Sequence, residues 1–252
     1  MAPISVQLYS LREESAADFD AVLAGIAQIG IAGVEPFNLF GKTPQAFRAQ
    51  VEDLGMQVSS THYPWATRDT DLSEVVDTVQ ALGLGRAPGG FMPDDFADRA
   101  ALEKTIERTQ RCAAELKRHD LTLFLHNHWW EYAEIDGRPA YYTLQDALPE
   151  IEFEIDTYWA ARFGQRDPAA EVARVADRAP LLHIKDGPLV KGAANVAVGS
   201  GALDIADIIG AADPDTLEWL VIEFDSCDTD TMDAIAGSYR YLIENQLGQG
   251  ND

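Results

Sequence analysis

Short apolar runs alternate with longer amphipathic segments along the whole chain. Eight apolar runs predict β-strands, at Ile4–Ser10, Gly33–Phe37, Gln57–Tyr63, Arg86–Gly90, Leu121–His128, Ile151–Asp156, Leu181–Lys185 and Trp219–Asp225. Segments of helical periodicity follow them at about 16–29, 43–54, 71–82, 98–118, 142–147, 168–176, 205–211 and 231–245. Gly30 and Gly55 stand where a glycine commonly ends a helix. Regular alternation of strand and helix predicts a parallel sheet with helices packed against it.

The number of strand–helix units narrows the fold. Eight such units in 252 residues are typical of an α/β (β/α)8 TIM barrel. No proline- or serine-rich linker divides the chain, so we expect a single domain over residues 1–252. A doubly wound open sheet is the alternative, but no glycine-rich fingerprint follows the first strand.

Composition limits the partners and the compartment. The chain has 42 acidic and 19 basic residues, a formal charge of −23, and no basic patch, which argues against nucleic-acid binding. It lacks a secretory leader pattern and any apolar run of the roughly 20 residues that span a bilayer. We therefore expect a cytoplasmic protein that does not bind membranes. Its two cysteines, Cys112 and Cys227, are expected to be free thiols.

Chemically active side chains gather where four predicted strands end. The segment LTLFLHNHWWEY (Leu121–Tyr132) changes from an apolar run to histidines, tryptophans and a glutamate, and three later runs end in IEFEID, LLHIKD and WLVIEFD. Alternation along these strands turns Glu154, Asp156, His183, Lys185 and Glu223 to the inner face of a barrel. In a barrel the active site lies at the carboxyl ends of the strands, so these side chains are expected to meet.

The residue types predict a metal site. Glu131, Asp156, His183 and Glu223 would offer three carboxylates and one imidazole to a divalent cation, with Mn²⁺ as the first choice and Mg²⁺, Co²⁺ or Zn²⁺ as alternatives. Converging carboxylates repel one another unless a cation neutralises them. The alternative is that Asp156 and Glu223 cap the following helices or pair with Lys185.

At this point the chain resembles a known family. The motifs HNHWWE, DTYW, LHIKD and VIEFD, with GVEPF and the loop VGSGALD, are similar to those of the sugar phosphate isomerase/epimerase family of xylose-isomerase-like barrels. The resemblance spans nearly the whole chain and implies a metal held by Glu, Asp, His and Glu from the fifth to the eighth strands. Asp156, His183 and Glu223 match this pattern. Phe124 stands where many relatives carry the first glutamate, so Glu131 is expected instead, with His126 and His128 as substitutes.

The resemblance implies a metal-dependent isomerase or epimerase acting on a small keto-sugar or polyol derivative. The metal would bind two neighbouring substrate oxygens and stabilise an enediolate, while Glu131 and Glu223 exchange the proton as base and acid. His62 and Lys185 are further catalytic candidates, and Lys185 could instead pair with Glu154. Expected substrate-binding residues are Glu35, Trp65, His126 and Trp159.

Other functions remain open. A lyase on the same site, of the inosose or dehydroshikimate dehydratase type or a keto-glycoside eliminase, would expel a leaving group. A non-catalytic sugar-binding barrel is the alternative from another class, favoured by Phe124 at the first-ligand position. The superfamily also contains abasic-site endonucleases, but this chain has few histidines and the wrong charge. Family members often pair, so a homo-oligomer is possible. The only pocket cations expected for a substrate phosphate are Lys185 and Arg86.

Overall fold

Eight parallel strands form one curled sheet in the computed structural model, which describes residues 1–68 and 71–251. The order across the sheet is β3-β2-β1-β10-β9-β8-β5-β4. The strands are β1 (Ile4–Gln7), β2 (Gly33–Glu35), β3 (Gln57–Val58), β4 (Arg86–Gly89), β5 (Thr122–His126), β8 (Glu152–Asp156), β9 (Leu181–Ile184) and β10 (Trp219–Ile222). Because β1 lies between β2 and β10, the first and last strands are neighbours, as barrel closure requires.

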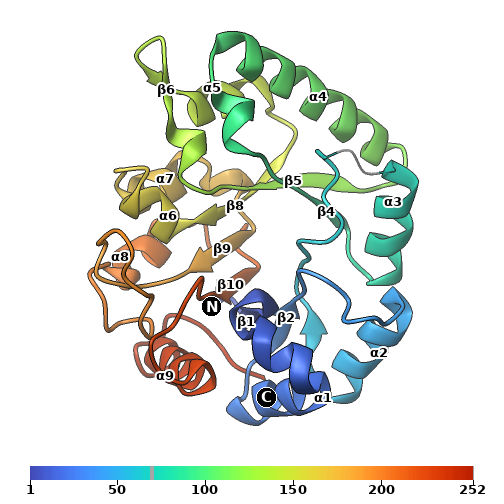
Figure 1. Ribbon diagram of the computed structural model, residues 1–252, viewed down its shortest axis with the longest axis vertical. Helices are drawn as coiled ribbons and strands as arrows, with labels where there is room; N and C mark the ends of the chain where they lie inside the picture. The colour runs from blue at the N-terminus through green and yellow to red at the C-terminus, as the bar shows by residue number, and fades with distance from the viewer. Residues whose placement is uncertain (69–70, 252) are drawn as a thin grey trace.

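Helices surround the sheet in chain order (Figure 1). They are α1 (Arg12–Ile29), α2 (Pro44–Asp53), α3 (Leu72–Ala81), α4 (Arg99–Lys117), α5 (Ala140–Ala147), α6 (Thr157–Arg162), α7 (Pro168–Arg174), α8 (Ile205–Gly210) and α9 (Thr231–Glu244). Between β3 and β4, the Ala66 amide donates to the Pro88 carbonyl at 2.8 Å. The predicted TIM-barrel class is confirmed, and the open-sheet alternative is wrong. The expected domain, residues 1–252, includes positions 69, 70 and 252, which lie outside the described residues.

Local sequence signals explain where the helices begin and end. The side chains of Thr43, Asp98 and Asp230 accept hydrogen bonds from backbone amides in the first turns of α2, α4 and α9. Gly30 ends α1 with φ of 97°, a left-handed conformation that glycine adopts without a steric penalty.

The structure contains elements that the pattern did not predict. Helix α6 begins directly after β8, ahead of α7, where the sequence suggested one helix only. A small antiparallel hairpin, β6 (Glu134–Ile135) and β7 (Arg138–Pro139), follows β5 and turns at Asp136 and Gly137, both with positive φ. Such an Asp-Gly pair is a strong hairpin signal, but strands this short carry no readable alternation.

One hydrophobic cluster extends from Ala2 to Leu242 and packs the outer face of the strands against the helices. At the amino-terminal end of the barrel, Arg86 pairs with Glu152 and, at 2.7 Å, with Glu218. In this fold, that end contributes to stability, while the opposite end carries the chemistry. Arg86 is therefore not a pocket cation, contrary to expectation.

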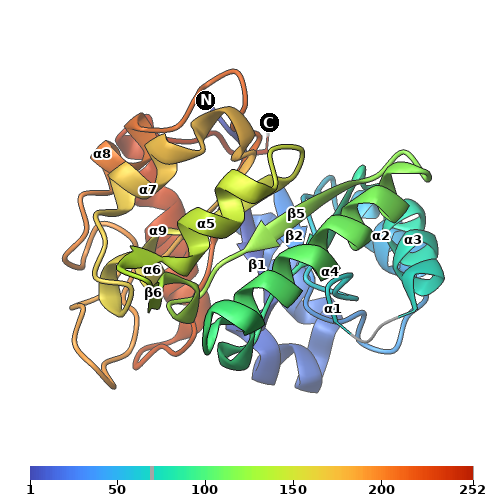
Figure 2. The ribbon, with the colours of Figure 1, turned by 90° about the horizontal axis from the view of Figure 1, so that it is seen from above.

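The chain ends lie side by side (Figure 2). The Ile4 amide donates to the carbonyl of Gln249 at 2.9 Å, which joins the C-terminal segment to β1. Cys112 and Cys227 are free thiols, as expected. Among the described residues, no helix combines the length and the apolar character needed to cross a membrane.

Candidate active site

Three adjacent strands bring the predicted ligands together. Asp156 ends β8 and lies in register with His183 of β9, while Glu223 follows the last residue of β10. One ligand atom from each of these three residues lies within 4.8 Å of the others. His183 Nδ1 is 2.7 Å from Glu223 Oε2 and 4.0 Å from Asp156 Oδ2. All three residues are buried, so the group forms the floor of the barrel mouth.

The two oxygens of Asp156 have different surroundings. Oδ1 accepts a hydrogen bond from the Trp159 amide at 2.7 Å and so caps α6, as the capping alternative predicted. Oδ2 is also buried, and it faces the Lys185 ammonium at 2.8 Å, as the pairing alternative predicted. Carboxylate oxygens and an imidazole nitrogen are the ligand types that Mn²⁺ and similar divalent cations bind. The donor set of Asp156, His183 and Glu223 therefore fits a divalent cation.

Lys185 places a positive charge against the same carboxylates. Its Nζ lies 2.8 Å from Asp156 Oδ2, 2.7 Å from Glu223 Oε2 and 3.1 Å from Asp225 Oδ2, rather than beside Glu154. Burial alone would lower the pKa of Lys185, but the three carboxylates outweigh burial and raise it well above its usual range. In turn, burial of Glu223 is outweighed by Lys185 and His183, which hold its pKa well below the usual range. Lys185 and Glu223 are thus both charged.

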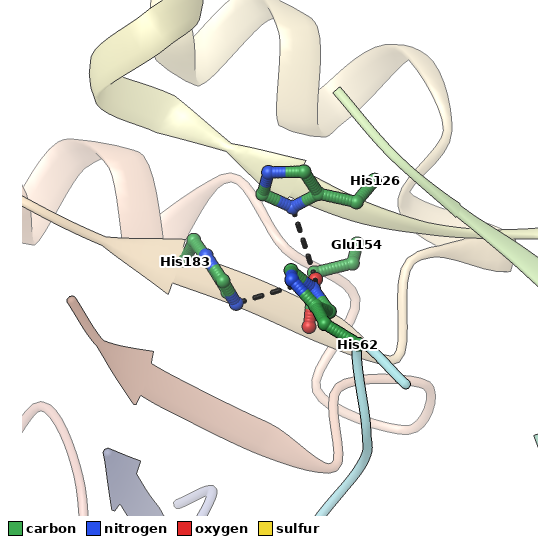
Figure 3. Close-up of side chains that lie close together, drawn as sticks. All are labelled: His62, His126, Glu154 and His183. Carbon is green, nitrogen blue, oxygen red and sulfur yellow. Dashed lines mark hydrogen bonds and ion pairs between the residues drawn. The ribbon is translucent and has the colours of Figure 1, made fainter. Parts of the chain in front are cut away.

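A second group consists of His62, His126, Glu154 and His183 (Figure 3). Glu154 Oε2 is 2.6 Å from His62 Nε2, 3.0 Å from His126 Nδ1 and 3.2 Å from His183 Nε2. His183 belongs to both groups, since its Nδ1 faces Glu223 and its Nε2 faces Glu154. One imidazole therefore connects the two clusters.

Glu35 supports His183 from behind. Its Oε1 lies 2.8 Å from His183 Nε2 and accepts a hydrogen bond from Gln7, while Oε2 accepts one from Ser60. A carboxylate on the far nitrogen of a ligand histidine fixes the orientation of the ring. Glu35 was expected to bind substrate. The structure buries it fully, and it does not line the cavity described below.

Protonation differs between two of these histidines, His183 and His126. Burial opposes charge on His183, but Glu154, Glu35 and Glu223 outweigh it and raise the pKa of His183 well above the usual value. Burial lowers the pKa of His126 well below that value. His126 is therefore a neutral imidazole, able to accept a hydrogen bond from a hydroxyl group.

A cavity of about 300 Å³ opens above these groups. Six of the predicted site residues line it: His62, Trp65, His126, Trp159, Lys185 and Glu223. Sequence reasoning assigned no role to Tyr9, Phe37 or Asp225, which also line the cavity, and named His128 only as a substitute ligand. Each follows the end of a strand, so the barrel rule would have found them, but nothing in their residue types singled them out.

The structure does not bring Glu131 into either ligand group. It lies in a 3₁₀ turn, Trp130–Tyr132, where Oε2 accepts from the His128 amide at 2.9 Å and Oε1 lies 3.8 Å from His128 Nδ1. Burial raises its pKa. Its roles as first metal ligand and as base stay predictions.

Asp186 is a structural residue of the site that sequence reasoning missed. Its buried carboxylate accepts hydrogen bonds from four backbone amides, those of Gly187, Gly199, Gly201 and Leu203. A Cβ at Gly201 would lie 2.0 Å from Asp186 Oδ1, so only glycine fits there. Asp186 therefore orders the VGSGALD loop beside the barrel mouth.

The Asp186→Asn variant is expected to lose about 1–3 kcal/mol of unfolding free energy, because an amide group would face backbone donors where an oxygen now accepts. Urea denaturation would measure the loss. Asp228→Asn, at an exposed position, is the matched control. Equal midpoints for the two variants would contradict this role.

Known proteins share this barrel architecture. The family model of xylose isomerase-like TIM barrels matches residues 23–244. No curated protein sequence is significantly similar to this chain. A solved sugar phosphate isomerase/epimerase from Parabacteroides distasonis is similar with a TM-score of 0.82 at 20% identity, over 98% of this chain and 95% of that one.

Two further solved structures are similar at lower identity. A D-allulose 3-epimerase from a Methylomonas species, in complex with D-allulose, has a TM-score of 0.67 at 17% identity, over 97% of this chain and 96% of its own. A probable 3-DHS dehydratase from Bacillus anthracis has a TM-score of 0.72 at 13% identity, over 96% and 99%. These likenesses show a shared fold, and the match of the family model over most of the sequence shows that the chain belongs to the family of xylose isomerase-like TIM barrels.

Proposed function

We propose that the protein is a divalent-metal-dependent isomerase or epimerase of a small keto-sugar or polyol derivative. The observation that carries the proposal is the group of Asp156, His183 and Glu223, which lies with Lys185 below a cavity of about 300 Å³. That volume is at the lower end of the range for small-molecule sites. The Parabacteroides and Methylomonas structures, both described as sugar isomerases or epimerases, support a carbohydrate substrate.

Asp156, His183 and Glu223 are the proposed ligands, with Mn²⁺ as the first choice. When bound, the cation would polarise neighbouring substrate oxygens and make the adjacent C–H group more acidic. Glu131 would join as the fourth ligand only if its carboxylate turned away from the His128 amide. Mg²⁺, Co²⁺ and Zn²⁺ are the alternatives.

The side chains around the cavity suit proton transfer. Glu223 is ionised and lies at the cavity wall, so it can accept the substrate proton. The Lys185 ammonium, 2.7 Å from Glu223 Oε2, can stabilise the negative oxygen of an enediolate. His62 and His126 would bind hydroxyl groups, and Trp65 and Trp159 would stack on the sugar ring.

We expect the purified protein to bind about one divalent ion per chain and to exchange a substrate proton with solvent. A panel of ketoses, D-allulose among them, would be incubated with the Mn²⁺-loaded protein in D₂O and analysed by NMR and mass spectrometry. Deuterium at one carbon with no other change of mass supports the proposal. EDTA treatment and His183→Ala are expected to abolish both metal and exchange. A chain that takes up no metal after addition of Mn²⁺ and exchanges no proton would favour a sugar-binding barrel.

A lyase is the second candidate. The observation that favours it is the buried Lys185 ammonium, a proton donor beside the carboxylate that would act as base. Together they could remove a C–H proton and protonate a leaving group on the neighbouring carbon. The same incubation separates the two reactions, since a dehydratase product lacks the mass of one water molecule.

A further inference from the structure

A second cavity of about 470 Å³ adjoins the first. The two cavities share Trp65 and His128 in their walls, so they are neighbouring spaces. The first holds the charged groups Lys185, Glu223 and Asp225, whereas the described walls of the second consist mainly of aromatic rings, with Arg68 as the charged group. The division is therefore chemical as well as spatial.

Four aromatic side chains line the second cavity: Tyr63, Trp65, Phe91 and Trp130. Trp130 lies parallel to the His128 ring, with centroids 4.1 Å apart and an interplanar angle of 12°. Trp65 packs directly on the backbone of Gly90, where an added Cβ would lie 1.0 Å from a ring carbon. The walls are thus flat and held in place, which favours a flat ligand group.

The charge of the second cavity is unlike that of the whole chain. Although the protein carries a net charge of −23, none of the described residues that line this cavity is acidic, and Arg68 contributes a positive charge. Aromatic walls without carboxylates fit a neutral or anionic aromatic group. A cavity of about 150 Å³ can hold a benzene molecule, so the volume suffices for a substituted ring.

We infer that the substrate is a sugar carrying an aromatic substituent, with the sugar in the first cavity and the aromatic group between Trp65, Trp130 and Phe91. This inference rests on the proposed function for the sugar part and adds a substrate class. Free small sugars would then fill only part of the site. The aromatic group would supply binding energy remote from the reacting carbon.

Affinities of phenyl and methyl glycosides of the same sugars test the inference. Phenyl and methyl β-D-glucoside, galactoside and xyloside would be titrated by ligand-observed NMR. The phenyl compounds are expected to bind about tenfold tighter or better, because a buried ring adds apolar contact that a methyl group lacks. If the phenyl and methyl glycosides of each sugar bound with equal affinity, or if neither bound, the inference would be overturned.

A variant that fills the second cavity makes the test specific. Met92 lines this cavity and is 48% exposed, so Met92→Trp should fold and obstruct the space. It is expected to remove the phenyl advantage and leave methyl glycoside affinity unchanged. Val190→Trp is the control, because Val190 is an apolar residue that is 58% exposed and does not line this cavity. This variant should keep the phenyl advantage. A phenyl advantage that survives Met92→Trp would also overturn the inference.

Failure of this inference and failure of the proposed function are distinguishable. The proposed function is measured by metal content and deuterium exchange, whereas this inference is measured by binding alone. A Met92-dependent phenyl advantage without exchange would leave the aromatic subsite intact and remove the isomerase proposal. Exchange into ketoses without any phenyl advantage would do the reverse.

Discussion

The Glu223→Gln variant is expected to exchange substrate protons about 10²- to 10⁴-fold more slowly than the wild type, the range that a general base contributes. Glutamine keeps the size of the side chain but cannot accept the proton. It also removes a negative charge that lies 2.7 Å from both Lys185 Nζ and His183 Nδ1, so metal affinity should fall as well. Deuterium incorporation at saturating Mn²⁺ separates the chemical effect from the loss of metal.

Glu218→Gln is the matched control, because Glu218 precedes the same strand at the opposite end of the barrel and pairs with Arg86. It should leave the exchange rate unchanged. If Glu223→Gln also exchanged at the wild-type rate with metal bound, Glu223 would not be the base.

The Lys185→Met variant is expected to lose about 3–5 kcal/mol of stability in metal-free buffer, as when one partner of a buried ion pair is removed. Methionine fills similar space, but it leaves Asp156 and Glu223 buried without their cation, and Lys185 itself is only 1% exposed. For a chain of this size the melting temperature should fall by roughly 10 °C. Differential scanning calorimetry with EDTA would measure this.

Added Mn²⁺ should restore much of the loss, because an ion that binds only the folded state stabilises it. Lys191→Met, at an exposed lysine, is the control and should change neither melting temperature nor its response to metal. Lys185→Arg tests whether charge alone suffices. If Lys185→Met and the wild type had the same melting temperature in EDTA, the buried carboxylates would not depend on Lys185 to balance their negative charge.

The residues that line the inner face of the site were predictable, because side chains along a strand point alternately to its two faces. Along the runs that became β8, β9 and β10, every second residue faces inward, and this placed Asp156, His183 and Glu223 together although they lie far apart in the sequence. The same rule sent the apolar residues outward, where Phe153, Ile184 and Leu220 are buried in the core.

The position of Glu131 could not be derived in this way. It lies beyond the end of β5, in a 3₁₀ turn, so strand alternation no longer describes where its side chain points. Its carboxylate is held by the His128 amide three residues earlier. The group around Glu154 was equally hidden, because it depends on contact between β8 and His62, 92 residues earlier in the chain.

By itself, the sequence determined the number and chain order of the eight barrel strands, the barrel class and the residues that share its inner face, because these follow from periodicity along one chain. Only the tertiary structure decided the finer arrangement of the site. It directed Lys185 to three carboxylates, placed His183 between two clusters and turned Glu131 toward the His128 amide. These features depend on rotamers and on distances of a few ångströms across the barrel, and the packing of several strands and loops sets them together.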